Sequence, residues 1–196
     1  MRAPATGLFF CDQPDELAAG DQAMITHAHA EGIAGALFVA LATAGAIHGR
    51  PSLEILEAAA APCRAERFSS RVERAQSWLA TERSPPSPEL ARQLGNGVAA
   101  SESRVTAIFL ALRFREQKFD DLLAFFRELG GDVDTIGAMS GAVWGALQGR
   151  EKLPPSSLAQ LEQHARMESL AAARYHPAPL ARGTNPSSNT DSPPSG

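Results

Sequence analysis

Aromatic residues, cysteines and long apolar runs are all scarce in this chain of 196 residues. Aromatics make up only 6% of it, and alanine and glycine are abundant, which favours closely packed helices over a sheet of branched and aromatic residues. The two cysteines, Cys11 and Cys63, lie far apart and match no metal-ligand spacing, so we expect reduced thiols. The longest apolar run, Ile33 to Ile47, has 15 residues, fewer than the roughly 18 expected of a membrane span.

An excess of positive charge is also missing. The net charge of −4 gives no indication of nucleic-acid binding. The start of the chain lacks the charged and then apolar pattern of a signal peptide. We therefore expect a soluble, cytoplasmic protein that binds neither nucleic acid nor membrane. Its length suits a single domain.

The spacing of apolar residues, with Gly and Pro turns between the segments, predicts an all-α fold without strands or repeats. We expect residues 1–12 to be extended or in a loop. From His176 the composition turns to Pro, Ser, Asn and Thr, which predicts a domain over residues 1–175 and a disordered tail over 176–196. Helices are expected at Asp15–Ala23, Glu31–Ala46, from an N-cap at Ser52, at Arg64–Thr81, from Pro88, and at Ser101–Phe114, Phe119–Leu129, Thr135–Gly149 and Ser156–Tyr175.

Two of these helices carry small residues four positions apart, on one helix face. Such a stripe predicts core packing in which a second helix approaches closely. Glycine lowers helix propensity, and close packing behind a functional site is a candidate for what compensates that cost. The members are Ala28, Gly32, Ala36, Ala40 and Ala44 in the first helix and Gly137, Gly141, Gly145 and Gly149 in the second.

An acidic turn precedes the second of these helices. Asp132 and Asp134 are two residues apart, Thr135 follows, and Gly130 and Gly131 let the backbone bend tightly before them. Two carboxylates and a hydroxyl in one turn suit a magnesium ion, which prefers oxygen ligands. The same residues also suit a helix N-cap, and on spacing alone both interpretations stand.

Four segments in order resemble the ADP-ribosylglycohydrolase family. Leu129–Leu147, which holds the acidic turn, resembles the family's C-terminal metal motif. Met1–Phe9 resembles the segment after its Gly-Asn-Gly substrate loop. Ile25–Ala36 resembles its Thr-His motif, and Leu94–Ser103, with a Gly-Asn-Gly turn, its third segment.

The resemblance implies a compact helical bundle that holds two magnesium ions. The family hydrolyses the glycosidic bond between ADP-ribose and an acceptor, so the implied partner is an ADP-ribosylated protein or another ADP-ribose conjugate. The matching metal ligands are Asp132, Asp134 and Thr135. The matching substrate-binding positions are His27, Gly97 and Val98.

The family's other half-site, a Thr-Asp-Asp segment near its N-terminus, has no counterpart here. The pair Asp120-Asp121 follows Phe119 in a helical stretch and is interpreted as a solvated face. We therefore expect the N-terminal part of the bundle to be missing, no catalytic residue in this chain, and no activity from the chain alone. The N-terminal half on a separate chain would complete the site. The alternative is a non-catalytic remnant that acts as a binding or interaction module.

The remaining conspicuous residues have structural explanations. His29 and His48 are expected at helix ends, and Trp78 and Trp144 in the core. A basic stripe interleaved with Glu66 and Glu73 predicts a solvated face with ion pairs; its members are Arg64, Arg67, Arg71 and Arg74.

Overall fold

The computed structural model describes residues 2–12, 16–26, 29–63, 66–83 and 85–175. Within these ranges the regular structure is helical, with no strand, which confirms the all-α prediction. The elements are α1 (Ala3–Phe9), α2 (Glu16–Met24), α3 (Ala30–Ile47), α4 (Ser52–Ala60), α5 (Glu66–Ala80), α6 (Ser87–Gln93), α7 (Ala100–Arg113), α8 (Phe119–Leu129), α9 (Val133–Gln148), the 3-10 turn η1 (Arg150–Lys152), α10 (Pro155–Ala159) and α11 (His164–Tyr175).

The chain groups into two compact units, residues 1–159 and residues 160–196. The first holds α1 to α10, and the second holds α11. The boundary expected after residue 175 remains a prediction, because the tail at 176–196 lies outside the described residues.

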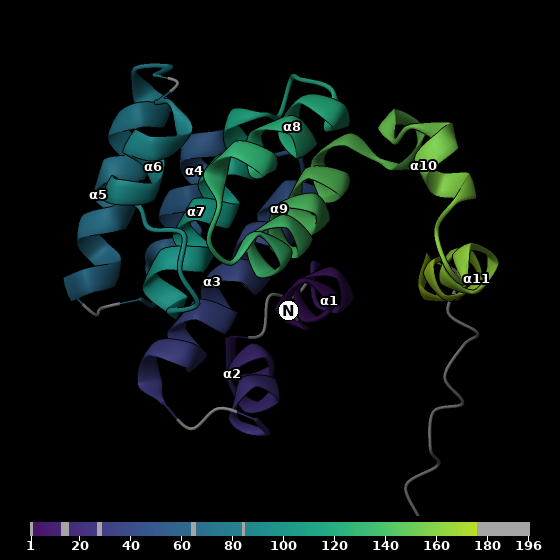
Figure 1. Cartoon of the computed structure of the whole chain (residues 1–196). Helices are drawn as coiled ribbons and strands as arrows, with labels where there is room; N and C mark the ends of the chain where they lie inside the picture. The colour runs from purple at the N-terminus through teal and green to yellow at the C-terminus, as the bar shows by residue number, and fades with distance from the viewer. Residues whose placement is uncertain (1, 13–15, 27–28, 64–65, 84, 176–196) are drawn as a thin grey trace, which may run out of the picture. The chain divides into compact units, whose positions relative to one another are not determined.

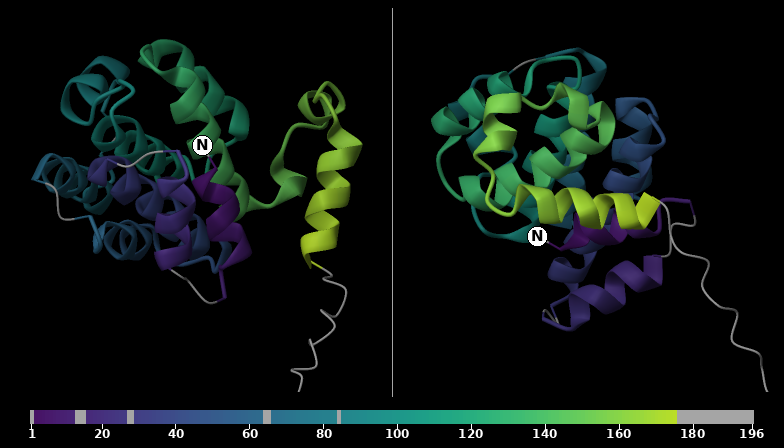
Figure 2. Two further views of the ribbon diagram at one scale, coloured as in Figure 1. Left: turned by 90° about the horizontal axis from the view of Figure 1, so that it is seen from below. Right: turned by 90° about the vertical axis from the view of Figure 1, so that its right-hand side faces the viewer.

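Helix α3 is the centre of the first unit (Figures 1 and 2). It packs against α1, α2, α4, α7 and α9. Its 18 residues are also long and apolar enough to meet the length and composition of a membrane-spanning helix, which the predicted run of 15 residues did not. Half of that stretch is buried among the other helices, as in the core helix of a bundle.

Aromatic rings join the outer helices to this core. The ring centroids of Phe38 on α3 and Phe68 on α5 lie 5.0 Å apart, and those of Trp78 and Phe109 lie 5.5 Å apart. The indole N–H of Trp144 donates to the backbone oxygen of Phe114 at 3.0 Å. Both tryptophans are almost fully buried, which confirms their predicted packing role.

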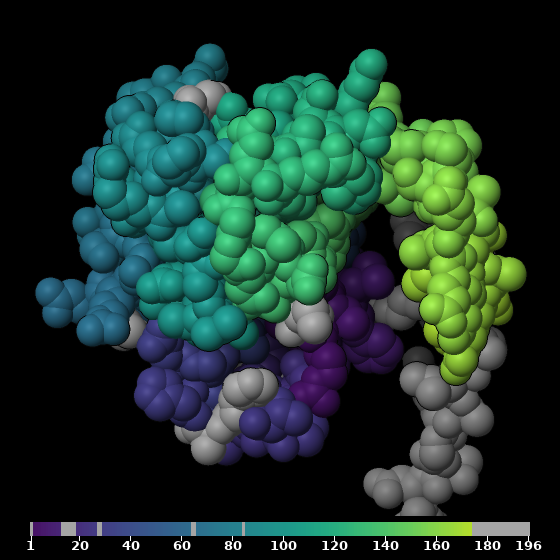
Figure 3. Space-filling view, in the orientation of Figure 1, coloured from purple at the N-terminus to yellow at the C-terminus, as the bar shows by residue number. Residues whose placement is uncertain are grey.

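The prediction of an extended segment over residues 1–12 is wrong, because Ala3 to Phe9 form α1. Pro4 lies in the first turn of this helix, where its missing N–H and fixed φ cost nothing. Gly7 lies directly on α3, and a Cβ there would overlap the backbone oxygen of Ala40. The small-residue stripe of α3 thus admits another helix, as predicted. Helix α1 also contacts α2 and α9, and the space-filling view shows α1 close to both (Figure 3).

The glycine stripe of α9 packs differently. A Cβ at Gly137 would meet the ring of Phe126 at 3.8 Å, and one at Gly141 would meet the ring of Phe119 at 3.9 Å. A Cβ at Gly145 would meet no atom within 4 Å. This stripe therefore accommodates aromatic side chains of α8 at ordinary contact distance, and at Gly145 no close packing explains the glycine.

The single helix predicted over Ser156–Tyr175 is interrupted. The structure places α10 and α11 there as separate helices. Gln163, just before α11, has a φ of +56°, a left-handed conformation that no α-helix interior accommodates.

Two glycine-to-alanine substitutions test the packing of α1 on α3. Gly7→Ala forces the helices apart, so we expect it to lower the free energy of unfolding by about 1–3 kcal/mol, the usual cost of overpacking. Gly145→Ala, with open space around it, is expected to raise that free energy by about 0.5–1 kcal/mol through helix propensity. Urea unfolding followed by circular dichroism measures both. Equal stability of the two variants would show that α1 does not depend on this contact.

Candidate metal and substrate site

The acidic turn is attached to the Gly-Asn-Gly turn by its backbone. Gly130 and Gly131 have φ values of +64° and +74°, which reverse the chain between α8 and α9. The N–H of Asp132 then donates to the backbone oxygen of Asn96 at 2.7 Å. A Cβ at Gly131 would overlap that same oxygen. Only glycine allows the two turns to approach this closely.

The Gly-Asn-Gly turn is in turn fixed by its neighbours. The side-chain amide of Asn96 donates to the backbone oxygen of Leu129 at 2.9 Å, and the hydroxyl of Thr106 donates to that of Gly95 at 2.6 Å. The side chain of Glu102 lies over Gly95 and Gly97 so closely that a Cβ at either would overlap it. The segments 94–103 and 129–147, which resemble two separate motifs of the family, are thus joined to each other in the structure.

The side chains of the acidic turn do not cap the helix. Asp132 occupies the N-cap position of α9, but its carboxylate accepts no hydrogen bond from the first turn. Within the described ranges, no hydrogen bond or ion pair involves the side chain of Asp132, Asp134 or Thr135. Asp132 and Thr135 are half-buried, and Asp134 is exposed. The N-cap interpretation therefore does not account for these oxygens.

These three side chains suit one side of a magnesium site. They offer carboxylate and hydroxyl oxygens on one turn, the donor type that this ion prefers. In the part of the chain that the structure describes, no three His, Cys, Asp or Glu side chains gather closely enough to hold a metal ion. The donor set fits a shared site and not a complete one, and the assignment of Asp132, Asp134 and Thr135 as metal ligands remains a prediction.

Arg104 is a further charged residue of this region that the sequence analysis did not single out. Its guanidinium donates to the backbone oxygen of Val98 at 3.2 Å and to the hydroxyl of Ser103 at 2.7 Å. Burial lowers the pKa of Arg104, and the charges of Asp132 and Glu31 oppose that shift. The available signal was an arginine one turn into helix α7, directly before the apolar stretch of that helix.

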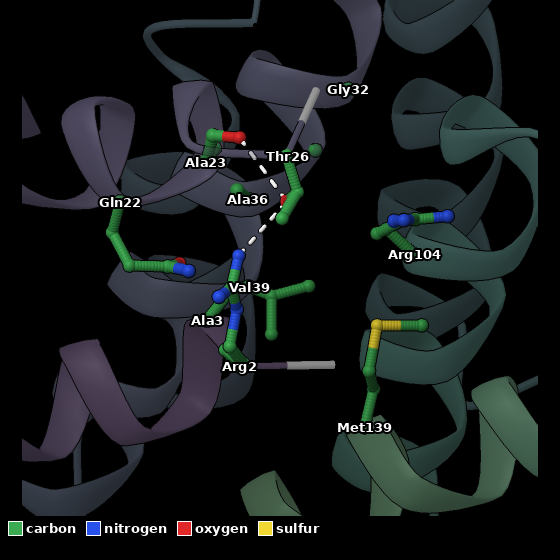
Figure 4. A pocket seen from close by; sticks show the side chains of 11 residues that line it. Arg2, Ala3, Gln22, Ala23, Thr26, Gly32, Ala36, Val39, Arg104 and Met139 are labelled. Atoms are coloured by element: carbon green, nitrogen blue, oxygen red, sulfur yellow. Dashed lines mark hydrogen bonds between the residues drawn. The ribbon is translucent and has the colours of Figure 1, made fainter.

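A small cavity of about 70 Å³ lies between α1, α2, α3, α7 and α9. Arg2, Gln22 and Thr26 line one side of it, and Arg104 and Met139 lie on the other (Figure 4). The guanidinium of Arg2 donates to the hydroxyl of Thr26 at 2.9 Å. Arg104 therefore connects the cavity with the Gly-Asn-Gly turn.

The predicted substrate residues are only partly placed. Gly97 and Val98 directly follow Asn96, whose backbone oxygen accepts the N–H of Asp132. The side chain of Val98 is 79% exposed and does not line the cavity. His27 lies outside the described residues, although its neighbour Thr26 lines the cavity. The substrate-binding role of all three remains a prediction.

Helix α3 contributes a carboxylate to the same region. Glu31 accepts the N–H of Ser101 at 3.0 Å, and hydrogen bonding from Ser101 lowers the pKa of Glu31. The ring of His29 accepts the N–H of Glu31 at 3.3 Å and caps α3, which confirms the predicted helix-end position. His48 likewise occupies the C-cap of α3.

Two charged segments were predicted to be solvated, and the structure agrees for their described residues except Arg71, which is half-buried. Asp120 and Asp121 are exposed in the first turn of α8. In the basic stripe of α5, Arg71 pairs with Glu102 of α7 at 3.3 Å, and not with a glutamate of its own helix. This ion pair holds the Glu102 side chain that covers the Gly-Asn-Gly turn. Arg64 lies outside the described residues.

The family model described as ADP-ribosylglycohydrolase matches residues 1–184, so the chain belongs to this family. It is similar to the protein named ADP-ribosylhydrolase ARH3 of Bos taurus, with 33% identity over 181 residues that cover 78% of this chain and 49% of the relative. The same protein of Homo sapiens is 32% identical, with 78% and 50% covered, and that of Gallus gallus is 31% identical, with 80% and 50% covered. The chain spans about half the length of the curated relatives it matches.

Neighbouring glycines provide a matched test of the contact between the turns. Both Gly130→Ala and Gly131→Ala introduce strain at positive φ, but only the second adds an overlap with the Asn96 oxygen. We expect Gly131→Ala to lower the free energy of unfolding by about 1–3 kcal/mol more than Gly130→Ala. Amide hydrogen exchange should show faster exchange of the Asp132 N–H in Gly131→Ala alone. Equal exchange rates in the two variants would contradict the described contact.

Proposed function

We propose that this chain supplies one half of a magnesium-dependent ADP-ribosylglycohydrolase site, which hydrolyses the glycosidic bond between ADP-ribose and a protein or small-molecule acceptor. Family membership supports the reaction class. The proposal gives Asp132, Asp134 and Thr135 the role of metal ligands. His27, Gly97 and Val98 contact the ADP-ribose.

One observation carries the proposal: the acidic turn presents oxygens that cap no helix and pair with no described side chain, although the turn itself is rigidly attached. Its backbone is fixed to Asn96, and Asn96 to Leu129. An arrangement that fixes the backbone and leaves carboxylates unpaired suits a bound cation better than it suits stability, because ligands must be held in place before the ion arrives.

The chemistry agrees with these residue types. Hydrolysis of a glycosidic bond develops positive charge on the ribose and requires a well-placed water. Bound magnesium ions would orient the ribose hydroxyls and lower the pKa of a water. The residues of this chain hold the ions and form a wall of the substrate pocket. None of them is proposed as the general acid or base.

Because the acidic turn supplies only part of the proposed magnesium site, a partner polypeptide must supply the other ligands. Three oxygen donors from one turn leave most of the coordination of a magnesium ion to other groups. Met24, Ile25 and Val98 expose apolar side chains near the cavity and the Gly-Asn-Gly turn, 60%, 74% and 79% exposed, and a further polypeptide would cover them. We propose that this partner carries the N-terminal half of the family's bundle and that the protein is cytoplasmic.

The second candidate is a binding module without catalysis, which retains the pocket wall and binds ADP-ribose or a partner protein. The absence of a three-residue metal cluster in the described ranges favours it. Magnesium-dependent activity after complementation decides between the two functions.

The chain alone is expected to release no ADP-ribose from ADP-ribosylated peptides in the presence of magnesium. Addition of a polypeptide with the family's N-terminal half, including its Thr-Asp-Asp segment, should restore release. Asp132→Asn should lower the restored rate by about 100-fold or more, at least as much as the loss of a supporting group around a metal costs. The readout is free ADP-ribose with and without a chelator.

Asp120→Asn is the matched control, because it removes an exposed carboxylate of α8 and should leave the rate unchanged. Turnover by the chain alone would refute the half-site. No gain on complementation, with ADP-ribose still bound, would support the binding module.

A further inference from the structure

We infer that the cavity between Arg2 and Arg104 is a binding site for a phosphate-sized oxyanion. The side chains of Arg2 and Arg104, which lie far apart in the sequence, line this one small space from opposite sides (Figure 4). Arginine is the side chain best suited to phosphate, because its planar fork donates two parallel hydrogen bonds. This inference concerns the cavity and does not depend on the proposed function of the acidic turn.

Arg104 is the residue with which a bound anion would form an ion pair. It is half-buried, and its two direct contacts are neutral oxygens, of Val98 and Ser103. Among the residues that the structure describes, no carboxylate forms an ion pair with it, and Asp132 and Glu31 act on it only from a longer distance. Partial burial of a cation without a contacting counter-ion has a cost in free energy, and an oxyanion in the cavity would offset part of it.

The opposite side of the cavity is organised for the same ligand. The guanidinium of Arg2 is held by the hydroxyl of Thr26 at 2.9 Å. When the amide of Gln22 is oriented with its oxygen towards Arg2, it accepts from Nε and Nη2 at 2.8 and 3.0 Å. Such contacts fix the plane of an otherwise flexible side chain, which lowers the entropic cost of binding.

The size and floor of the cavity also suit a small ion. Its volume of about 70 Å³ is several times the roughly 15 Å³ that one water requires. Gly32 and Gly35 line it without side chains, and a Cβ at Gly35 would lie 3.3 Å from Cδ of Arg104. The glycines thus leave room for the arginine and for a group of several atoms beside it.

Titration calorimetry of the 196-residue chain with inorganic phosphate, in chloride buffer at constant ionic strength, tests the site. We expect saturable binding that weakens about tenfold or more in Arg104→Gln and in Arg2→Gln. Arg127→Gln, which changes an exposed arginine of α8, should bind phosphate as the unchanged chain does. Circular dichroism checks that each variant folds. If Arg104→Gln does not fold, Arg2→Gln still tests the site, because Arg2 is exposed.

Asp132→Asn separates this site from the proposed metal site. Removal of a carboxylate that acts on Arg104 should strengthen phosphate binding about threefold, whereas it should lower the restored hydrolase activity by about 100-fold or more. Displacement of phosphate by ADP-ribose would identify the phosphate of a nucleotide as the natural source, and phosphate binding without displacement would identify the free ion. The absence of saturable binding, or equal binding by Arg104→Gln and Arg127→Gln, would overturn the inference.

Discussion

The packing of five helices on α3 is the constraint on which the rest of the structure depends. Helices α1, α2, α4, α7 and α9 all contact this helix. Such crowding is possible because α3 is built largely of Ala and Gly, so that the backbone of α1 reaches Ala40 at Gly7. Helices α7 and α9 start at the Gly-Asn-Gly turn and at the acidic turn, so α3 also determines where these two turns meet.

The site then follows from a contact between backbones. Gly131 lies against the oxygen of Asn96, and the N–H of Asp132 donates to that oxygen. Because main-chain groups hold the turn, the carboxylates of Asp132 and Asp134 are not needed to stabilise it. Arg104 reaches from the same turn to a cavity that Arg2 lines on the other side. The carboxylates proposed to hold a cation and the arginine proposed to bind an anion are therefore both anchored to the segment 96–98 by hydrogen bonds to its main-chain oxygens.

The sequence predicted the helices best where a local signal marks their ends. Phe119–Leu129 was predicted with the bounds of α8, because glycine follows it directly. The segment 1–12 was predicted wrongly, because α1 is short and is stabilised by its contact with α3. The break between α10 and α11 was also not predicted, because Gln163 has a positive φ without being Gly and no Pro precedes it directly. At the site, the order of motifs indicated the acidic turn and the Gly-Asn-Gly turn. Their contact, and the position of Arg104 between them and the cavity, depend on packing between helices far apart in the chain, which periodicity does not encode.

The oxygens of the acidic turn are proposed to bind a divalent cation. Crystals of the chain in complex with a polypeptide that carries the family's N-terminal half, soaked in manganese chloride, provide the test, because manganese prefers the same oxygen ligands as magnesium and scatters anomalously. We expect an anomalous peak within coordination distance of Asp132, Asp134 and Thr135. Peaks elsewhere on the surface, with none at this turn, would contradict it.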